Sequence, residues 1–221
     1  MFHDHVLDFY KQLQDDWKLP KGIDLIYPFG HERVQNLLES FAKKYYTGKQ
    51  KRHFLFGINP GRFGAGMTGI PFTDPIILSE VCGIEYTAPR KNELSSIFIY
   101  DVIDQFGGPL EFYKHYYISS VCPLGFTKEN KNYNYYDSKE LFNCLKDIII
   151  HSIEYQISKY CHRDIAYSIG QGKNYKILCD LNAAHGWFEN IVTLPHPRWV
   201  MQYKRKTKDV YIDEYLIKLE N

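Results

Sequence analysis

Apolar residues return every three or four positions along several stretches of the chain, which is the period of an amphipathic helix. The clearest stretch is residues 32–46, where the apolar positions share one face. A second covers residues 138–161, and its apolar stripe consists of Leu141, Leu145, Ile148, Ile149, Ile153 and Ile157. The pattern predicts these two helices and four more, over residues 4–16, 93–105, 173–184 and 209–219.

Four short apolar runs stand between these helices and end at turn residues, which is typical of buried strands. They cover residues 53–58, 116–121, 164–169 and 191–194. Strands that alternate with helices indicate a parallel sheet covered on both faces. We therefore predict the α/β class: a three-layer α/β/α arrangement with a central four-stranded, mostly parallel sheet. Residues 1–221 contain no internal repeat or linker, so we predict a single domain.

The composition narrows the class of protein. The 221 residues are 44% hydrophobic, enough to build an apolar core. Lys and Arg (27) nearly balance Asp and Glu (26), and the net charge of +1 argues against a histone-like binder while allowing a local basic patch. The five cysteines are widely spaced and form no Cys-x-x-Cys, which argues against a disulfide scaffold or a metal site built mainly of Cys.

Targeting signals are also missing from the sequence. No apolar run reaches the roughly 18 residues of a membrane span. The first residues lack the basic and apolar regions of a secretion signal. We therefore expect a monomer without membrane partners in the cytoplasm, associated with the nucleoid if the source is bacterial.

Three unusual segments each follow directly on a predicted strand. They are Asn-Pro-Gly at residues 59–61, Ser-Val-Cys-Pro at 120–123 and Pro-His-Pro-Arg at 195–198. In open parallel sheets, the carboxyl ends of the strands lie at one edge, and functional sites form there. The sequence therefore predicts one site that gathers all three segments.

The glycine-rich loop at residues 57–72 contains an accidental match to a nucleotide-binding motif. Residues 64–69 match the dinucleotide-binding pattern Gly-x-Gly-x-x-Gly and follow a strand. That pattern needs a helix immediately afterwards, whose N-terminus holds the pyrophosphate. Pro71 and Pro75 interrupt the residues where this helix would run. A rigid pocket for a flat ligand explains the glycines and prolines better.

The loop closely resembles the first motif of the single-strand-selective monofunctional uracil-DNA glycosylases, within the uracil-DNA glycosylase superfamily. That motif runs Gly-x-Asn-Pro-Gly-x-Phe-Gly and then Thr-Gly-x-Pro-Phe. It is matched at the same spacing by Gly57, Asn59, Pro60, Gly61, Phe63, Gly64, Thr68, Gly69, Pro71 and Phe72. Residues 93–96, 122–124 and 194–198 resemble later family motifs in the same order, so the resemblance covers roughly residues 50–210.

The resemblance implies a monofunctional DNA glycosylase of base excision repair. Such an enzyme flips uracil, and with a wider pocket xanthine or hypoxanthine, out of DNA and hydrolyses the glycosidic bond, leaving an abasic site. Asn59 would orient the attacking water, and His196 would donate a hydrogen bond to the departing base. The residues implied to bind the base are Gly61, Phe63, Ala65, Phe72, which would stack on it, and Ser120.

DNA that carries a deaminated base, single- or double-stranded, is the expected partner. The residues expected to contact it are Ser95, Ser96, Arg198, Trp199, Lys204, Arg205 and Lys206. Basic side chains would hold phosphates, while Arg198 or Trp199 would enter the gap left by the base. No metal or organic cofactor is implied. Lyase chemistry is not expected, because the three rim segments contain no lysine.

Two departures from the family pattern point to a divergent, second SMUG-like subfamily. Ser120 stands where the family has an Asn that reads the base, and a hydroxyl should read uracil less strictly. The family's His-Pro-Ser-Pro-Arg is replaced here by Leu194-Pro195-His196-Pro197-Arg198. Two alternatives stay open: a catalytically impaired nucleic-acid-binding module of the same fold, and a nucleotide-binding enzyme that uses the loop at residues 64–69.

Overall fold

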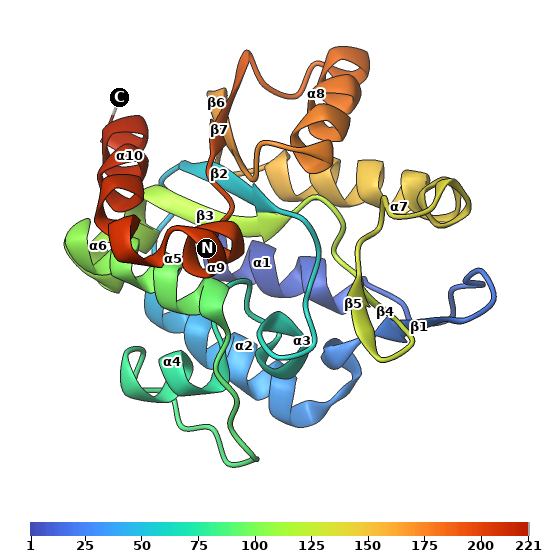
Figure 1. The fold of residues 1–221 in the computed structure, drawn as a ribbon, viewed down its shortest axis with the longest axis horizontal. Helices are drawn as coiled ribbons and strands as arrows, with labels where there is room; N and C mark the ends of the chain where they lie inside the picture. Colours follow the sequence, from blue (N-terminus) through green and yellow to red (C-terminus); the bar gives the residue numbers. More distant parts are fainter. Residues whose placement is uncertain (221) are drawn as a thin grey trace.

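The computed structural model describes residues 1–220. Its centre is a four-stranded sheet in the order β3-β2-β6-β7, in which all neighbouring strands are parallel (Figure 1). The strands are β2 (Arg52–Gly57), β3 (Tyr116–Ser120), β6 (Cys161–Ile169) and β7 (Asn190–Leu194). The predicted α/β class and the four predicted strands are confirmed.

Helices cover both faces of this sheet, as the three-layer prediction requires. The longer ones are α1 (Phe2–Lys11), α2 (Glu32–Tyr45), α5 (Leu94–Gln105), α6 (Pro109–His115), α7 (Lys139–Ile157), α8 (Lys173–His185) and α10 (Lys208–Glu220). Connections between parallel strands are right-handed, so the β2–β3 connection and the connections to β6 and β7 run over opposite faces. Accordingly, α5, α6 and α10 lie on one side in Figure 1, and α7 and α8 lie on the other.

The strand register brings the loops that follow the strands to one edge. Gly57, the last residue of β2, is paired with Ser120, the last residue of β3. On the other side, Ile169 at the end of β6 is paired with Leu194 at the end of β7. The segments that begin at Ile58, Val121 and Pro195 therefore leave the sheet together.

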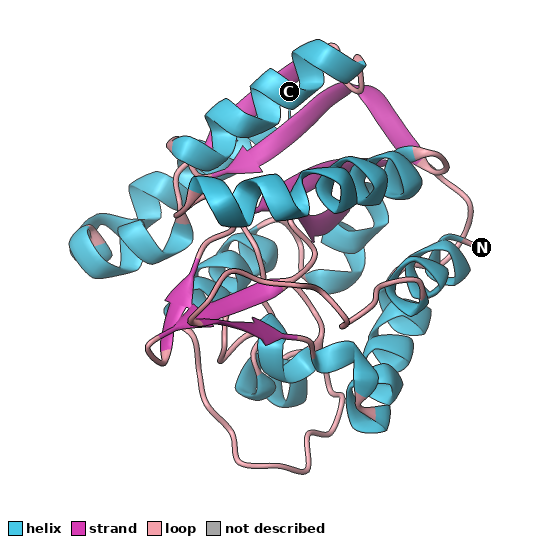
Figure 2. Cartoon of the chain, turned by 90° about the vertical axis from the view of Figure 1, so that its right-hand side faces the viewer, coloured by secondary structure: helices cyan, strands magenta, loops and turns pink. Residues whose placement is uncertain are grey.

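A second, antiparallel sheet was not predicted. It has the order β1-β4-β5, with β1 (Ile23–Ile26), β4 (Gly125–Lys128) and β5 (Lys131–Tyr133), and it stands apart from the parallel sheet in Figure 2. Its strands have only three or four residues and little periodicity. The β4–β5 turn has φ 50° at Glu129 and 58° at Asn130, without the glycine that usually signals such a hairpin.

Other elements also differ from the prediction. The first helix ends at Lys11 rather than at residue 16, and α7 ends at Ile157 rather than at residue 161. The prediction missed α6 and four short elements: η1 (Pro28–Gly30), α3 (Ala65–Thr68), α4 (Pro75–Glu80) and α9 (Pro197–Tyr203). It also missed η2 (Arg205–Thr207). Within residues 1–220, none of the helices combines the length and the apolarity needed to span a membrane.

Arg52, at the start of β2, is a charged residue inside the aromatic core. Its side chain is 0% exposed and donates hydrogen bonds to the carbonyl oxygens of Tyr113 (2.7 Å), Gln50 (3.1 Å) and Thr47 (2.9 Å). The guanidinium carbon lies 4.4 Å from the centroid of the Phe2 ring. Burial lowers the pKa of Arg52 to about 10, so the side chain stays charged at neutral pH. It thereby joins the first helix, the start of β2 and the end of α6.

We expect Arg52→Met to lower the free energy of unfolding by roughly 3 kcal/mol, since three carbonyl groups lose a charged donor. Lys51→Met, which changes the exposed neighbouring side chain, should stay within about 0.5 kcal/mol of the wild type. Urea unfolding followed by circular dichroism measures both. Equal stability of the two variants would contradict this account of Arg52.

Candidate active site

A cleft of about 410 Å³ opens at the carboxyl edge of the parallel sheet. Residues from distant parts of the chain line it: Ile58, Asn59, Pro60, Gly61, Phe72, Glu93, Ser95, Asn132, Asn134, His196, Arg198, Trp199, Gln202 and Tyr203. A deeper pocket of about 40 Å³ shares Asn59, Phe72 and Glu93 with the cleft and adds Ala65 and Ser120. The expected convergence of the three segments is therefore seen in one continuous hollow.

Asn59 is held in a fixed orientation by the small antiparallel sheet. Its Oδ1 accepts a hydrogen bond from the backbone N–H of Tyr135 (3.2 Å). Its Nδ2 donates to the carbonyl oxygens of Pro60 (3.3 Å) and Tyr133 (3.4 Å). An amide oxygen has a second lone pair, so Oδ1 can still accept a hydrogen bond from a water in the cleft.

Phe72 packs against the end of β2 and lines both the cleft and the deeper pocket. A Cβ atom on Gly57 would lie 2.8 Å from Cε2 of the Phe72 ring, so only glycine leaves room for the ring there. The backbone of Phe72 has φ 52°, a left-handed conformation that is strained for a bulky residue. Such strain is typical of functional sites, where the surroundings hold it in place.

The residues on either side of Phe72 supply that support. The hydroxyl of Thr68 donates to the carbonyl oxygen of Thr73 (2.6 Å) and accepts from the backbone N–H of Ile70 (3.1 Å). The Thr73 hydroxyl lies 3.0 Å from the hydroxyl of Tyr100 on α5. Both threonines are fully buried, so these bonds are protected from water and fix the position of the Phe72 ring.

His196 caps the N-terminus of α9. Its Nδ1 accepts a hydrogen bond from the backbone N–H of Arg198 (3.2 Å), and Pro197, which has no N–H, occupies the first helical position. Because Nδ1 acts as an acceptor, we assign the proton of the neutral ring to Nε2. The Tyr215 hydroxyl donates to the carbonyl oxygen of Pro195 (2.5 Å), which fixes the segment just before the histidine.

The electrostatic environment keeps His196 neutral. Burial, followed by the positive charge of Arg198, lowers the pKa of His196 to about 4. At neutral pH the side chain therefore presents an uncharged Nε2–H donor to the cleft. Such a donor can stabilise negative charge that develops on a bound group.

Ser120 lies in the deeper pocket, where no donor or acceptor among residues 1–220 is bonded to its hydroxyl. Behind it a further small hollow, lined by Ala65, Ser119 and Pro123 among others, continues inward. The neighbouring Ser119 differs, because its hydroxyl donates to Oε1 of Gln156 (2.6 Å). Ser120 is thus the serine that is free to contact a ligand.

Glu93 also lines the cleft. It belongs to the motif at residues 93–96, but no role was predicted for it from the sequence. A Cβ atom on Gly64 would lie 2.0 Å from Oε2 of Glu93, and one on Gly61 would lie 3.4 Å from Oε1. The carboxylate therefore packs directly on the glycine loop. Burial raises the pKa of Glu93, and nearby Arg198 partly opposes this effect.

Helix α9 forms one wall of the cleft with an aromatic and basic face. Trp199 (42% exposed) and Tyr203 (72% exposed) are four residues apart and lie on the same side of the helix. Arg198 lines the cleft beside them. Tyr203, Gln202, Asn132 and Asn134 were not assigned to the site from the sequence; for Tyr203, its place among aromatic residues interleaved with the basic run at residues 198–208 was the available signal.

Several expected site residues lie outside the cleft. Ser95 lines it, but Ser96 is 0% exposed, so it is too deep to reach DNA. The Phe63 ring lies instead between two cations, 4.7 Å from the Arg62 guanidinium carbon and 4.5 Å from Lys91 Nζ. The remaining basic residues lie exposed on the surface just beyond α9: Lys204, Arg205 and Lys206.

The glycine loop does not provide a dinucleotide site of the usual kind. After Gly64 the chain forms only α3, a single turn that ends at Gly69 in a left-handed conformation. A pyrophosphate site needs the N-terminus of a longer helix at this point. The geometry therefore argues against the nucleotide-binding alternative.

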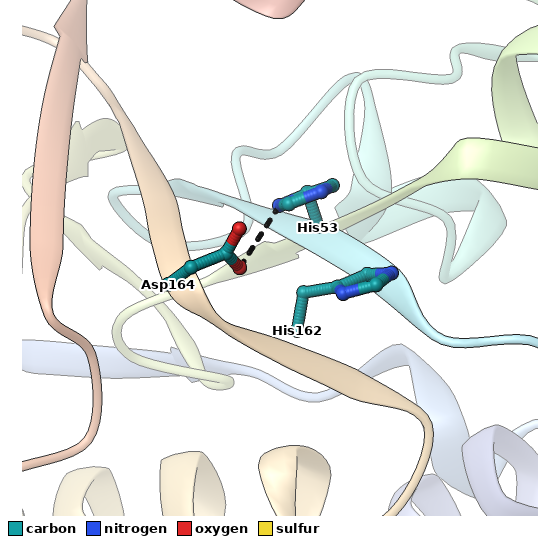
Figure 3. A group of neighbouring side chains, drawn as sticks. All are labelled: His53, His162 and Asp164. Carbon is teal, nitrogen blue, oxygen red and sulfur yellow. Dashed lines mark ion pairs between the residues drawn. The ribbon is translucent and has the colours of Figure 1, made fainter. Parts of the chain in front are cut away.

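A cluster outside the cleft, His53, His162 and Asp164, has spacing compatible with a metal site (Figure 3). His53 Nδ1 lies 3.8 Å from Asp164 Oδ1, but the two imidazole rings are stacked at 4.4 Å with planes only 10° apart. A ligating nitrogen directs its lone pair in the ring plane, and parallel planes do not meet at a common ion. His53 also lies near the start of β2, at the opposite end of the strand from the loop that carries Asn59.

Comparison with known proteins identifies the class of this chain. A family model of the uracil DNA glycosylase superfamily matches residues 44–220. The chain belongs to this superfamily, whose members act on DNA, and its function is that of a uracil-DNA-glycosylase-like hydrolase in DNA repair.

Solved structures narrow the class further. Eleven chains match. One is the crystal structure of wild-type Pedobacter heparinus SMUG2, with 46% sequence identity and a TM-score of 0.95 over 99% of this chain and 97% of that chain. A search of curated proteins finds no match. The chain is therefore a SMUG-like member of the superfamily, as the sequence motifs indicated.

The lowered pKa of His196 predicts a pH-dependent stability. Between pH 6.5 and about 4 the unfolded chain binds a proton at this residue that the folded chain does not, so acidification favours unfolding. His196→Asn keeps a capping side chain and removes the titrating group. We expect the variant to lose less stability than the wild type when the pH falls from 7 to 4.5, as measured by thermal unfolding.

The matched control is His151→Asn, which changes an exposed histidine on α7. This variant should follow the wild-type pH dependence. A His196→Asn protein with the full wild-type loss of stability in acid would show that His196 is not held neutral by the fold.

Proposed function

We propose that this protein is a monofunctional DNA glycosylase that hydrolytically excises uracil from DNA and leaves an abasic site. The observation that carries the proposal is the arrangement of a fixed amide (Asn59), an aromatic ring (Phe72) and a neutral imidazole donor (His196) around one cleft. Membership of the uracil DNA glycosylase superfamily supports the same conclusion. Base excision repair is the process in which such an activity serves, acting wherever the cell keeps its DNA.

The three groups have complementary roles in the proposed reaction. The target nucleotide leaves the DNA stack, and its base stacks on Phe72, an interaction worth about 1–3 kcal/mol. As the glycosidic bond breaks, negative charge develops on the base, and the Nε2–H of His196 donates a hydrogen bond to its carbonyl oxygen. Asn59 orients the water that attacks the positively charged sugar carbon.

Ser120 supports a broad preference for deaminated bases. Its free hydroxyl can donate to one base and accept from another, unlike an amide that presents fixed donor and acceptor positions. We propose that xanthine and hypoxanthine are excised as well as uracil.

The aromatic and basic face of α9 supports DNA binding at the mouth of the cleft. We propose that Trp199 or Arg198 fills the gap left by the extruded base, and that Lys204, Arg205 and Lys206 hold phosphates. Lysine is absent from the lining of the cleft and the deeper pocket within the described chain, which supports hydrolysis without a lyase step. A catalytically impaired binding module is the remaining alternative, and base release distinguishes it.

The test uses an oligonucleotide with a single uracil, followed by alkali. The wild-type protein should generate strand scission at the uracil, whereas Asn59→Ala should release the base at least about 100-fold more slowly while still binding the DNA. Asn143→Ala, an exposed change on α7, is the control and should act like the wild type. Binding without scission by the wild type would favour the impaired module.

Phosphate contacts beyond α9 predict a salt-dependent affinity. Lys206→Ala should weaken binding at low salt and reduce the slope of log K against log salt by about one. Lys146→Ala removes an exposed lysine on the distant helix α7 and should leave the slope unchanged. Fluorescence anisotropy between about 50 and 200 mM salt measures both, and equal slopes would remove Lys206 from the DNA interface.

A further inference from the structure

Among residues 1–220, Glu93 is the only carboxylate that lines both the cleft and the deeper pocket. The backbone of Glu93 is anchored by Asp74, whose Oδ2 accepts a hydrogen bond from the Glu93 N–H (2.8 Å). The other oxygen of Asp74 accepts the backbone N–H groups of Ile76 (2.9 Å) and Ile77 (3.0 Å) at the start of α4. Asp74 itself is 0% exposed, so Glu93 begins α5 from a rigid support.

The carboxylate of Glu93 is held in the cavity without a hydrogen-bond donor from the described part of the chain. Its oxygens occupy the space that side chains at Gly61 and Gly64 would need, so these two glycines make room for it. A carboxylate that loses water contacts and gains no donor is destabilised, and such groups concentrate at functional sites. A carboxylate with a purely structural role would accept hydrogen bonds from the backbone N–H groups of the glycine loop.

The charged groups around Glu93 suit a proton acceptor. Arg198, on α9 across the cleft, favours the ionised form, whereas Asp74 disfavours it. His196, which also lines the cleft, is neutral above about pH 4. Arg62, in the glycine loop, directs its guanidinium over the Phe63 ring. Within residues 1–220, Glu93 is the only carboxylate among the residues that line the cleft, so it is the acid there that can accept a proton from the substrate side.

The proposed hydrolysis needs such a group. Asn59 can orient a water but cannot take its proton, since an amide does not titrate near neutrality. The sugar also carries positive charge in the transition state. A carboxylate beside the sugar stabilises that charge and can accept the proton that the water loses on forming its bond to carbon.

We propose that Glu93 is a further catalytic residue, which accepts the proton of the Asn59-bound water. The bond between the base and C1′ breaks, and its electron pair leaves with the base. The water oxygen forms the new bond to C1′, and one water proton moves to Glu93. His196 stabilises the base anion through its hydrogen bond; solvent then protonates the released base, and Glu93 returns its proton to solvent. This role rests on the glycosylase function proposed above.

The test compares single-turnover release of uracil by the wild type and Glu93→Gln between pH 5 and 9. The wild-type rate should rise with pH and then level off, because the ionised form of Glu93 is required and its pKa is raised. Glu93→Gln should be about 100-fold slower on the plateau and lose this rise. Glu93→Asp, which keeps the charge on a shorter side chain, should recover part of the rate and the rise.

Two further measurements separate catalysis from structure. Binding of an oligonucleotide with a non-cleavable 2′-fluoro-deoxyuridine, and the midpoint of thermal unfolding, should be unchanged in Glu93→Gln. Glu85→Gln, at an exposed position before the same helix, should retain the wild-type rate and pH profile.

A wild-type rate and profile in Glu93→Gln would overturn the role of Glu93 and leave the proposed function intact. So would a parallel loss of binding and rate, because it would indicate a purely structural side chain. If the wild type releases no base, the proposed function fails, and the role of Glu93 fails with it.

Discussion

Parallel hydrogen bonding of β2 with both of its neighbours is the constraint on which the site depends. The side chains that meet in the cleft come from positions 59, 72, 93, 120 and 196, which are far apart in the chain. Pairing of Gly57 with Ser120, and of Ile169 with Leu194, brings the loops that follow these strands to a single edge. An antiparallel arrangement of the same strands would send alternate loops to opposite edges. Strand direction, more than any single contact, therefore assembles the chemistry.

Two polar groups that face the cleft already form hydrogen bonds with other parts of the protein. The Asn59 amide is bonded to the β5 segment, and the ring of His196 is bonded to the start of α9. Each keeps one position free for a ligand. Such preorganised groups need little rearrangement during a reaction, and for this reason they stabilise a transition state more effectively than mobile polar groups do. The small antiparallel sheet, which looks peripheral, thus supports a residue of the proposed active site.

The parallel sheet, its four strands and most of the long helices could be predicted from the sequence, because each has a regular apolar pattern bounded by turn residues. The antiparallel sheet could not, since its strands are short and the β4–β5 turn has positive φ at Glu129 and Asn130 rather than at glycines. For the site, the motif predicted that Asn59, Phe72 and His196 meet. Ser96 and Phe63 were assigned from their match to the family motifs, and a motif match does not reveal that one is fully buried and that the ring of the other lies beside two cations.

The left-handed backbone of Phe72 has a consequence for the evolution of thermal tolerance in this chain. A glycine at that position would relax the strained dihedral angle, but it would also remove a ring that packs against the core and add conformational freedom to the unfolded chain. The same exchange would delete the ring that lines the hollow. Adaptation to warm surroundings therefore has to proceed through other parts of the molecule, because relief of the strain at this position would cost the packing of the ring.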